Sequence, residues 1–289
     1  MLKNIRTDLA VESRPPHVEQ GADDGVMTRE TEQSGFKLTE TEICKGRGEE
    51  LTGRAAGLYI SLDTGKLWLE DNARRHSAAA VLSGLITRLM PGDKEGGVLV
   101  AGLGNEDISA DSIGPKTVGR LVVTHHLKRL NPSLYEGLGF GDMAAVVPSV
   151  LGKTGVESRT LIKAAADCVK PACVIVVDAL AARSLHRLAT TVQLTCVGIS
   201  PGSGVCNSRE EISEKTVGCP VIAIGVPTVV DVPTLLWEAG GTPDEAAKGF
   251  FVTPKESDVM TRVMAELIAA AINRAVHVNT EDPDEYAPL

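Results

Sequence analysis

Aromatic residues are scarce in this sequence, at 3% of 289 positions. An excess of positive charge is also missing, because 38 Asp and Glu residues outnumber 29 Lys and Arg residues and give a formal net charge of -9. Direct binding of nucleic acid calls for basic patches and aromatic stacking platforms. The composition therefore argues against a nucleic-acid-binding protein, and it requires a core built from Val, Ile, Leu and Ala.

Long apolar runs and metal-ligand patterns are missing as well. No run approaches the roughly 18 apolar residues of a membrane-spanning helix, and charges at Lys3, Arg6 and Asp8 interrupt the place where a secretory signal would be apolar. The six cysteines form no C-x-x-C pair and no zinc-type cluster with histidine. We therefore expect free thiols in a reducing cytoplasm, no membrane partner, no metal and no cofactor.

The remaining pattern is an alternation of two kinds of segment. Fully apolar stretches predict buried strands, and segments with apolar residues every three or four positions predict helices. This alternation indicates an α/β fold with a mostly parallel or mixed sheet flanked by helices. Residues 9–66 are more polar and predict a peripheral N-terminal arm with short strands. The strands are expected at 97–103, 144–147, 173–177, 191–197 and 220–226, and the helices at 71–89, 113–130, 155–169 and 255–275.

Three familiar motifs fail on a physical requirement. The G-x-S-x-G sequence around Ser200 is followed by Pro201, which lacks the backbone N–H of an oxyanion hole. The Gly-Lys-Thr sequence lacks the upstream glycine of a phosphate-binding loop, because Val147 stands there. The Gly-Leu-Gly sequence would place Asp107 where a dinucleotide fingerprint needs its third glycine. Serine hydrolase, nucleotide phosphate and dinucleotide chemistry are therefore disfavoured.

Two aspartates remain at informative places. Asp178 directly follows the apolar stretch 173–177, and Asp111 lies in the loop after the stretch 97–103. Each has an ordinary structural explanation, since Asp111 can cap or begin a helix and Asp178 can pair with Arg183. The carboxyl ends of parallel strands meet at one edge of a sheet, so the two carboxylates can also be neighbours.

A close pair of carboxylates has a chemistry of its own. The two carboxylates do not easily carry a negative charge at the same time, so one of them retains a proton. One carboxylate then activates a water molecule while the other protonates the leaving amine. Peptide hydrolysis without a nucleophilic side chain is the reaction that such a pair predicts.

At this point the chain resembles the germination proteases, the spore proteases of spore-forming bacteria. The resemblance covers nearly the whole chain in order, with a shorter link between Asp231 and Val252 than in longer family members. The segments that carry it are RTDLAVE (6–12), GLGN (102–105) with Asp111, IGPK (113–116), VDALAARS (177–184), ISPGSGV (199–205), VIAIGVPTVVD (221–231) and VTPKESD (252–258).

The resemblance implies an atypical aspartic endopeptidase whose catalytic aspartates are Asp111 and Asp178. Its implied substrates are small acid-soluble spore proteins, the DNA-coating proteins that are degraded during germination. It also implies a fold related to the hydrogenase maturation endopeptidases, a homotetramer, and a location in the cytoplasm of the forespore or spore core.

The same resemblance gives the N-terminus a role. The family is made as a zymogen, and its self-cleavage site maps between Asp8 and Leu9. Residues 1–8 would then be a propeptide, and residues 9–289 a single peptidase domain. The sequence around this bond is similar to the cleavage pattern in the substrates. An acidic residue before the cut bond calls for a cationic partner, such as Arg183 or a lysine.

Two other functions stay open on the sequence. One is a metal-dependent maturation endopeptidase of the hydrogenase-maturation type, for which the chain offers Glu106 but no convincing histidine. The other is a non-catalytic binding protein that keeps the same fold.

Overall fold

The protein is described by a computed structural model over residues 6–14, 24–92, 96–202, 209–242 and 245–277. Nine strands in these residues form one sheet in the order β1-β2-β3-β7-β8-β6-β4-β5, with β9 paired to β8. Their bounds are β1 Val26–Gln33, β2 Phe36–Ile43, β3 Gly57–Asp63, β4 Val98–Gly102, β5 Met143–Val146, β6 Cys173–Ala181, β7 Thr191–Thr195, β8 Val221–Asp231 and β9 Phe251–Val252.

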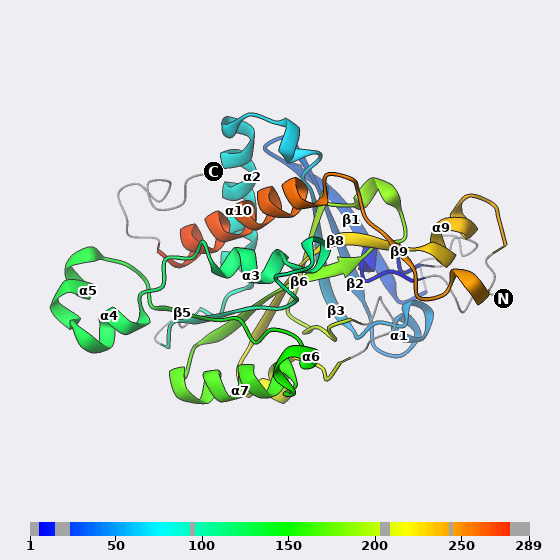
Figure 1. Ribbon diagram of the computed structural model, residues 1–289. Helices are drawn as coiled ribbons and strands as arrows, with labels where there is room; N and C mark the ends of the chain where they lie inside the picture. The colour runs from blue at the N-terminus through cyan, green and yellow to red at the C-terminus, as the bar shows by residue number, and fades with distance from the viewer. Residues whose placement is uncertain (1–5, 15–23, 93–95, 203–208, 243–244, 278–289) are drawn as a thin grey trace.

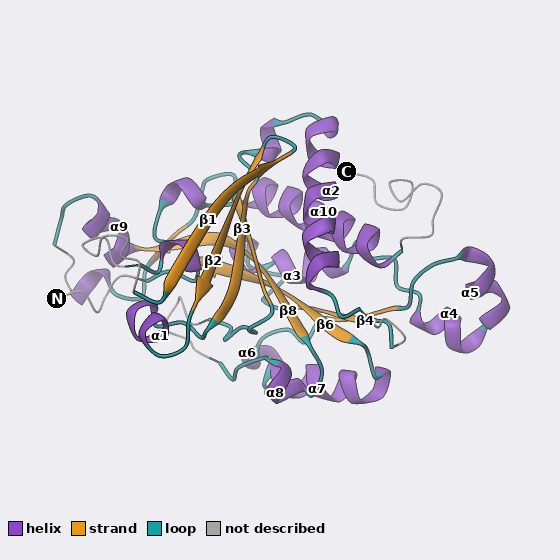
Figure 2. Cartoon of the chain, turned by 180° about the vertical axis from the view of Figure 1, so that it is seen from behind, coloured by secondary structure: helices purple, strands orange, loops and turns teal. Residues whose placement is uncertain are grey.

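The sheet has a parallel half and an antiparallel half. Strand β4 pairs in parallel with β5 and β6, and β6 pairs in parallel with β8. From β8 outwards, β7, β3, β2 and β1 are antiparallel to their neighbours. Figure 2 shows β1, β2 and β3 on the side of the sheet away from β4. The predicted α/β class with a mixed sheet is confirmed.

Helices cover both faces of the parallel half. In Figure 1, α2, α3 and α10 lie on one side of the sheet, and α6 and α7 lie on the other. The bounds are α1 Arg47–Thr52, α2 Asn72–Leu89, α3 Ile113–Val118, α4 His125–Leu130, α5 Pro132–Leu138, α6 Leu151–Thr154, α7 Ser158–Val169, α8 Glu214–Val217, α9 Val232–Glu238 and α10 Ser257–Val276.

The side chains of β6 show how the two faces are built. Ile175 and Val177 are buried in the core beneath α2 and α10, whereas Val174 and Val176 are buried in a second core with Ile162 of α7. Alternate residues of a strand point to opposite faces, so a strand covered on both faces must be apolar throughout. The predicted strand at 173–177 is confirmed for this reason.

The predicted helix over 113–130 is wrong in its middle. Two short helices, α3 and α4, occupy its ends. The backbone N–H of Val122 donates to the side chain of Asn273 (3.0 Å), and the N–H of Thr124 donates to the carbonyl oxygen of Met143 (2.9 Å). Tertiary partners therefore take the donors that a continuous helix would use for itself.

The segment predicted as an arm contributes a three-stranded antiparallel part of the main sheet. Strands β1, β2 and β3 contain 8, 8 and 7 residues, so they are not short. Leu38 of β2 and Leu62 of β3 are buried in the same core as the parallel strands. Within the described ranges, no helix combines the length and apolar character needed to cross a bilayer.

Candidate active site

Asp178 lies inside strand β6, which continues to Ala181 instead of ending at residue 177 as the sequence predicted. It pairs in register with Gly225 of β8, and its carboxylate accepts a hydrogen bond from the backbone N–H of Ala179 (2.9 Å). Only 5% of Asp178 is exposed. A carboxylate is therefore held inside the sheet, with one backbone donor near it.

Asp111 ends a short 3-10 turn, Ser109–Asp111, in the loop after β4. Its Oδ2 accepts a hydrogen bond from the backbone N–H of Asn105 (2.8 Å) across the same loop. The N-cap position of α3 belongs to Ser112, so Asp111 does not have the capping role that the sequence allowed. Its carboxylate instead closes the loop that begins at the end of β4.

The fold brings the loop of Asp111 beside Asp178, because β4 ends at Gly102 opposite Val177 while β6 continues to Ala181. The backbone N–H of Leu103, just after β4, donates to the carbonyl oxygen of Val177, just before Asp178 (2.8 Å). Asp111 and Asp178 both line one cavity of about 690 Å³. The structure therefore places the two predicted residues at the same site.

The electrostatics of the pair are asymmetric. Burial raises the pKa of Asp178 well above its ordinary value, and the charge of Asp111 raises it further. Burial also raises the pKa of Asp111, while the hydrogen bond from Asn105 lowers it. The proton of such a pair belongs to both carboxylates, but the more buried Asp178 holds it more strongly.

The N-terminal segment lies against the same end of β6. The backbone N–H of Asp8 donates to the carbonyl oxygen of Ala181 (2.7 Å), and the N–H of Ala181 donates to Oδ2 of Asp8 (2.8 Å). Leu9 is fully buried in a cluster with Leu180 and Leu188. Asp8 lines the cavity that contains the aspartate pair, so the predicted cleavage site is next to the predicted catalytic site.

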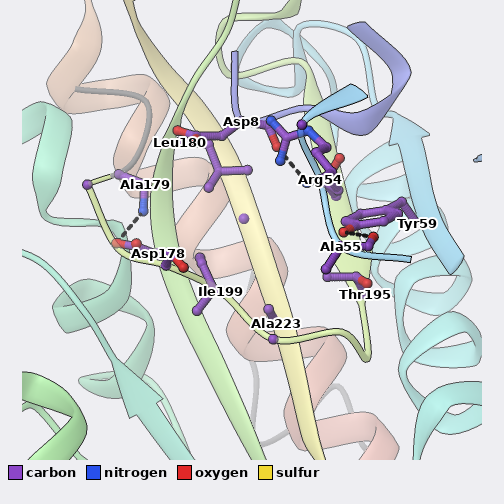
Figure 3. Close-up of a pocket in the computed structure, with 16 residues that line it drawn as sticks. Asp8, Arg54, Ala55, Tyr59, Asp178, Ala179, Leu180, Thr195, Ile199 and Ala223 are labelled. Carbon is purple, nitrogen blue, oxygen red and sulfur yellow. Dashed lines mark hydrogen bonds between the residues drawn. The ribbon is translucent and has the colours of Figure 1, made fainter. Parts of the chain in front are cut away.

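The cation beside Asp8 is Arg54, which the sequence did not indicate. Both residues line a smaller cavity of about 200 Å³ together with Asp178, and Figure 3 shows their side chains next to each other. Arg183, the expected partner, forms an ion pair with Glu238 instead (3.0 Å). Arg54 belongs to a polar segment without a motif, so only the folded chain reveals this proximity.

The family model for germination proteases matches residues 5–239 of this sequence. The chain belongs to the germination protease family. It is 45% identical to a germination protease of Caldanaerobacter subterraneus subsp. tengcongensis over 80% of this chain and 71% of that one. It is 36% identical to one of Clostridium acetobutylicum over 95% and 96% of the two chains. The resemblance found in the sequence is confirmed, and family membership makes the chain a protease associated with spore germination.

One solved structure is also similar, a nickel–iron hydrogenase maturation protease from Thermococcus kodakarensis. The TM-score is 0.36 at 17% sequence identity, over 65% of this chain and 98% of that chain. A similarity at this level carries no functional inference. Glu106, the metal ligand considered in the sequence, is exposed, and the described residues contain no group of three or more His, Cys, Asp or Glu side chains placed to hold a metal ion.

Glu12 anchors the N-terminal segment of this germination protease. It is 5% exposed, and its carboxylate accepts hydrogen bonds from the backbone N–H groups of Arg183 (2.7 Å) and Ser184 (3.1 Å). The hydroxyl of Thr7 donates to the same carboxylate (2.5 Å), and Arg187 lies 3.4 Å from it.

We expect Glu12→Ala to lower the free energy of unfolding by about 3 kcal/mol, because it leaves buried donors without an acceptor. Urea denaturation followed by circular dichroism measures this change. Glu32→Ala is the matched control, since Glu32 is exposed on β1 and its loss is expected to cost less than about 0.5 kcal/mol. Equal effects of the two substitutions would contradict the anchoring role of Glu12.

Proposed function

We propose that this chain is a self-processing endopeptidase that uses Asp111 and Asp178 to activate water. Its first substrate is its own Asp8–Leu9 bond, and its later substrates are small acid-soluble spore proteins during germination. The observation that carries this proposal is the common cavity, because both aspartates and Asp8 line it. The aspartate chemistry and the zymogen role are the parts that go beyond family membership.

The proposed reaction follows from the asymmetry of the pair. Asp111, the less buried carboxylate, takes a proton from water as the water oxygen bonds to the carbonyl carbon of Asp8. Asp178, which holds its proton more strongly, gives that proton to the nitrogen of Leu9 when the carbon–nitrogen bond breaks. The products are a new carboxylic acid at Asp8 and a new amine at Leu9, and the acid then passes its proton to the amine or to solvent. Transfer of the proton from Asp111 back to Asp178 restores the starting state.

This reaction divides the chain into a propeptide, residues 1–8, and a peptidase domain, residues 9–289. In the propeptide segment Asp8 pairs with Ala181 of β6, and the backbone N–H of Arg6 donates to the hydroxyl of Thr234 in α9 (3.2 Å). Residues 1–5 lie outside the described ranges. The homotetramer and the location in the spore core, which the resemblance implied, stay predictions. The spore proteins enter the proposal through the family, whose members are proteases of germination.

The full chain, incubated at mildly acidic pH, is expected to acquire a new N-terminus at Leu9. Asp111→Asn is expected to slow this processing about 1,000-fold, because it removes the base that accepts the proton of water. N-terminal sequencing over time measures the effect, and cleavage of a Thr-Asp-Leu-Ala-Val-Glu peptide measures it in trans.

Asp107→Asn is the matched control in the same loop. Asp107 is exposed and forms an ion pair with Lys153 (2.5 Å), so its loss is expected to change processing less than about twofold. A Leu9 start that appears at the wild-type rate in Asp111→Asn would contradict the proposal. Loss of cleavage in a chelator, with recovery on addition of nickel or zinc, would indicate the metal-dependent reaction instead.

A further inference from the structure

One side chain, that of Gln193, forms hydrogen bonds with the backbone on both sides of the bond between Asp8 and Leu9. Nε2 of Gln193 donates to the carbonyl oxygen of Asp8 (3.0 Å), and Oε1 of Gln193 accepts from the backbone N–H of Ala10 (2.7 Å). Gln193 is itself buried in strand β7. One buried amide therefore contacts the carbonyl group that precedes the proposed cut and the N–H group that follows it.

Arg54 lies against the segment that precedes that bond, at Thr7 and Asp8. Its Nη2 donates to the carbonyl oxygen of Thr7, and its Nε is enclosed without a hydrogen-bond partner among the described residues. Burial lowers the pKa of the Arg54 guanidinium, and the charge of Asp8 is the largest influence in the opposite direction. The carboxylate of Asp8 is thus the largest single charge that offsets the burial of this cation.

Departure of residues 1–8 would remove this carboxylate. The space left would contain the Arg54 guanidinium, the backbone N–H of Ala181 and Nε2 of Gln193, all of which now contact or compensate Asp8. An enclosed cation that loses its largest compensating charge is unfavourable, so such a space favours an anionic group. This space adjoins the proposed catalytic residues, because Asp178 lines the same cavity.

We propose that Arg54 and Gln193 form the site that recognises the acidic residue directly before the cut bond, first Asp8 and then the corresponding Asp or Glu of a substrate peptide. Arg54 and the N–H of Ala181 bind the acidic side chain, and Gln193 binds the carbonyl group of the same residue. Arg54 is thus a specificity-determining residue and Gln193 a positioning residue. This inference rests on the proposed function, because it assigns the substrate site of that activity.

The test compares two peptides that differ in one atom group, Thr-Asp-Leu-Ala-Val-Glu and Thr-Asn-Leu-Ala-Val-Glu. We expect the processed wild-type enzyme to prefer the Asp peptide about 100-fold in kcat/KM. We expect Arg54→Met to reduce this preference to less than about threefold. The reduction is expected to come from a lower kcat/KM for the Asp peptide, with kcat/KM for the Asn peptide unchanged. Gln193→Met is expected to slow both peptides alike, by about tenfold or more, and to leave the preference intact.

Arg183→Met is the matched control, because Arg183 is a nearby cation that pairs with Glu238 and is expected to leave the Asp preference unchanged. Thermal unfolding shows whether each variant is folded. The comparison of the two peptides in the wild type measures the Asp preference without any variant. Retention of the full preference in Arg54→Met, or its loss in Arg183→Met, would overturn the assignment. Failure of the wild type to cut either peptide would contradict the proposed function itself.

Discussion

Asp178→Asn is expected to lower peptide cleavage about 1,000-fold or more while the fold remains intact. Asparagine has nearly the same shape and still accepts the N–H of Ala179, but it cannot deliver a proton to the leaving amine. Steady-state cleavage of the Thr-Asp-Leu-Ala-Val-Glu peptide measures the loss, with Asp107→Asn as the active control. Activity near that of the wild type in Asp178→Asn would refute the assignment of the general acid.

The same substitution is expected to stabilise the protein at neutral pH. Burial and the charge of Asp111 raise the pKa of Asp178 in the folded state above its value of about 3.9 in the unfolded chain. The folded wild type binds the proton more tightly, so its stability falls as the pH rises through the raised pKa. Asparagine never ionises, so the stability of Asp178→Asn is expected not to fall with pH for this reason.

Urea denaturation across the pH range checks the sign. Below the unfolded pKa of about 3.9 the two proteins are expected to be equally stable, and towards pH 7 the variant is expected to be the more stable. For a domain of this size, each 1 kcal/mol of difference corresponds to about 2–4 °C in Tm. Parallel stability curves for wild type and variant would contradict the raised pKa. The activity of the wild type is expected to decline over the pH range in which Asp178 loses its proton.

The sequence predicts the strands and helices best where burial alone decides them. The stretch 173–177 is apolar because helices cover both faces of β6, and the periodic residues of α10, such as Val263 and Leu267, are all buried. The end of β6 is a different case. A carboxylate after an apolar run indicates a strand end, yet pairing with β8 continues from Asp178 to Ala181. Only the neighbouring strand supplies that information.

The nearness of the two aspartates follows from the parallel pairing of the adjacent strands β4 and β6, because β4 ends opposite Val177, the residue before Asp178. The residues around Asp8 do not follow from any local pattern. Gln193 lies 183 residues from Ala10 in the chain and meets it because β7 joins the antiparallel half of the sheet to β8. Arg54 precedes β3 and approaches Asp8 by the same topology. Such contacts depend on the order of the strands in the sheet. The spacing of residues along the sequence does not reveal that order.

Gly104→Ala is expected to reduce cleavage at least 100-fold, because Gly104 sets the path of the loop that carries Asp111. Its φ of +109° is rarely adopted by residues with a side chain. A Cβ atom at Gly104 would lie 1.9 Å from the backbone carbonyl oxygen of Asp111 and 3.0 Å from its Oδ1. The backbone cannot yield as a flexible side chain does, so Asp111 must move, and a shift of about 1 Å in a catalytic group costs about 100-fold in rate.

Gly84→Ala is the matched control for this substitution. Gly84 is exposed on helix α2, and a Cβ atom there meets no atom within 4 Å. Alanine in a helix is expected to raise the free energy of unfolding by about 0.5–1 kcal/mol without affecting cleavage. Circular dichroism melts and peptide cleavage separate the two outcomes. If Gly104→Ala kept the wild-type rate, the close contact between this glycine and Asp111 would not control the geometry of the aspartate pair.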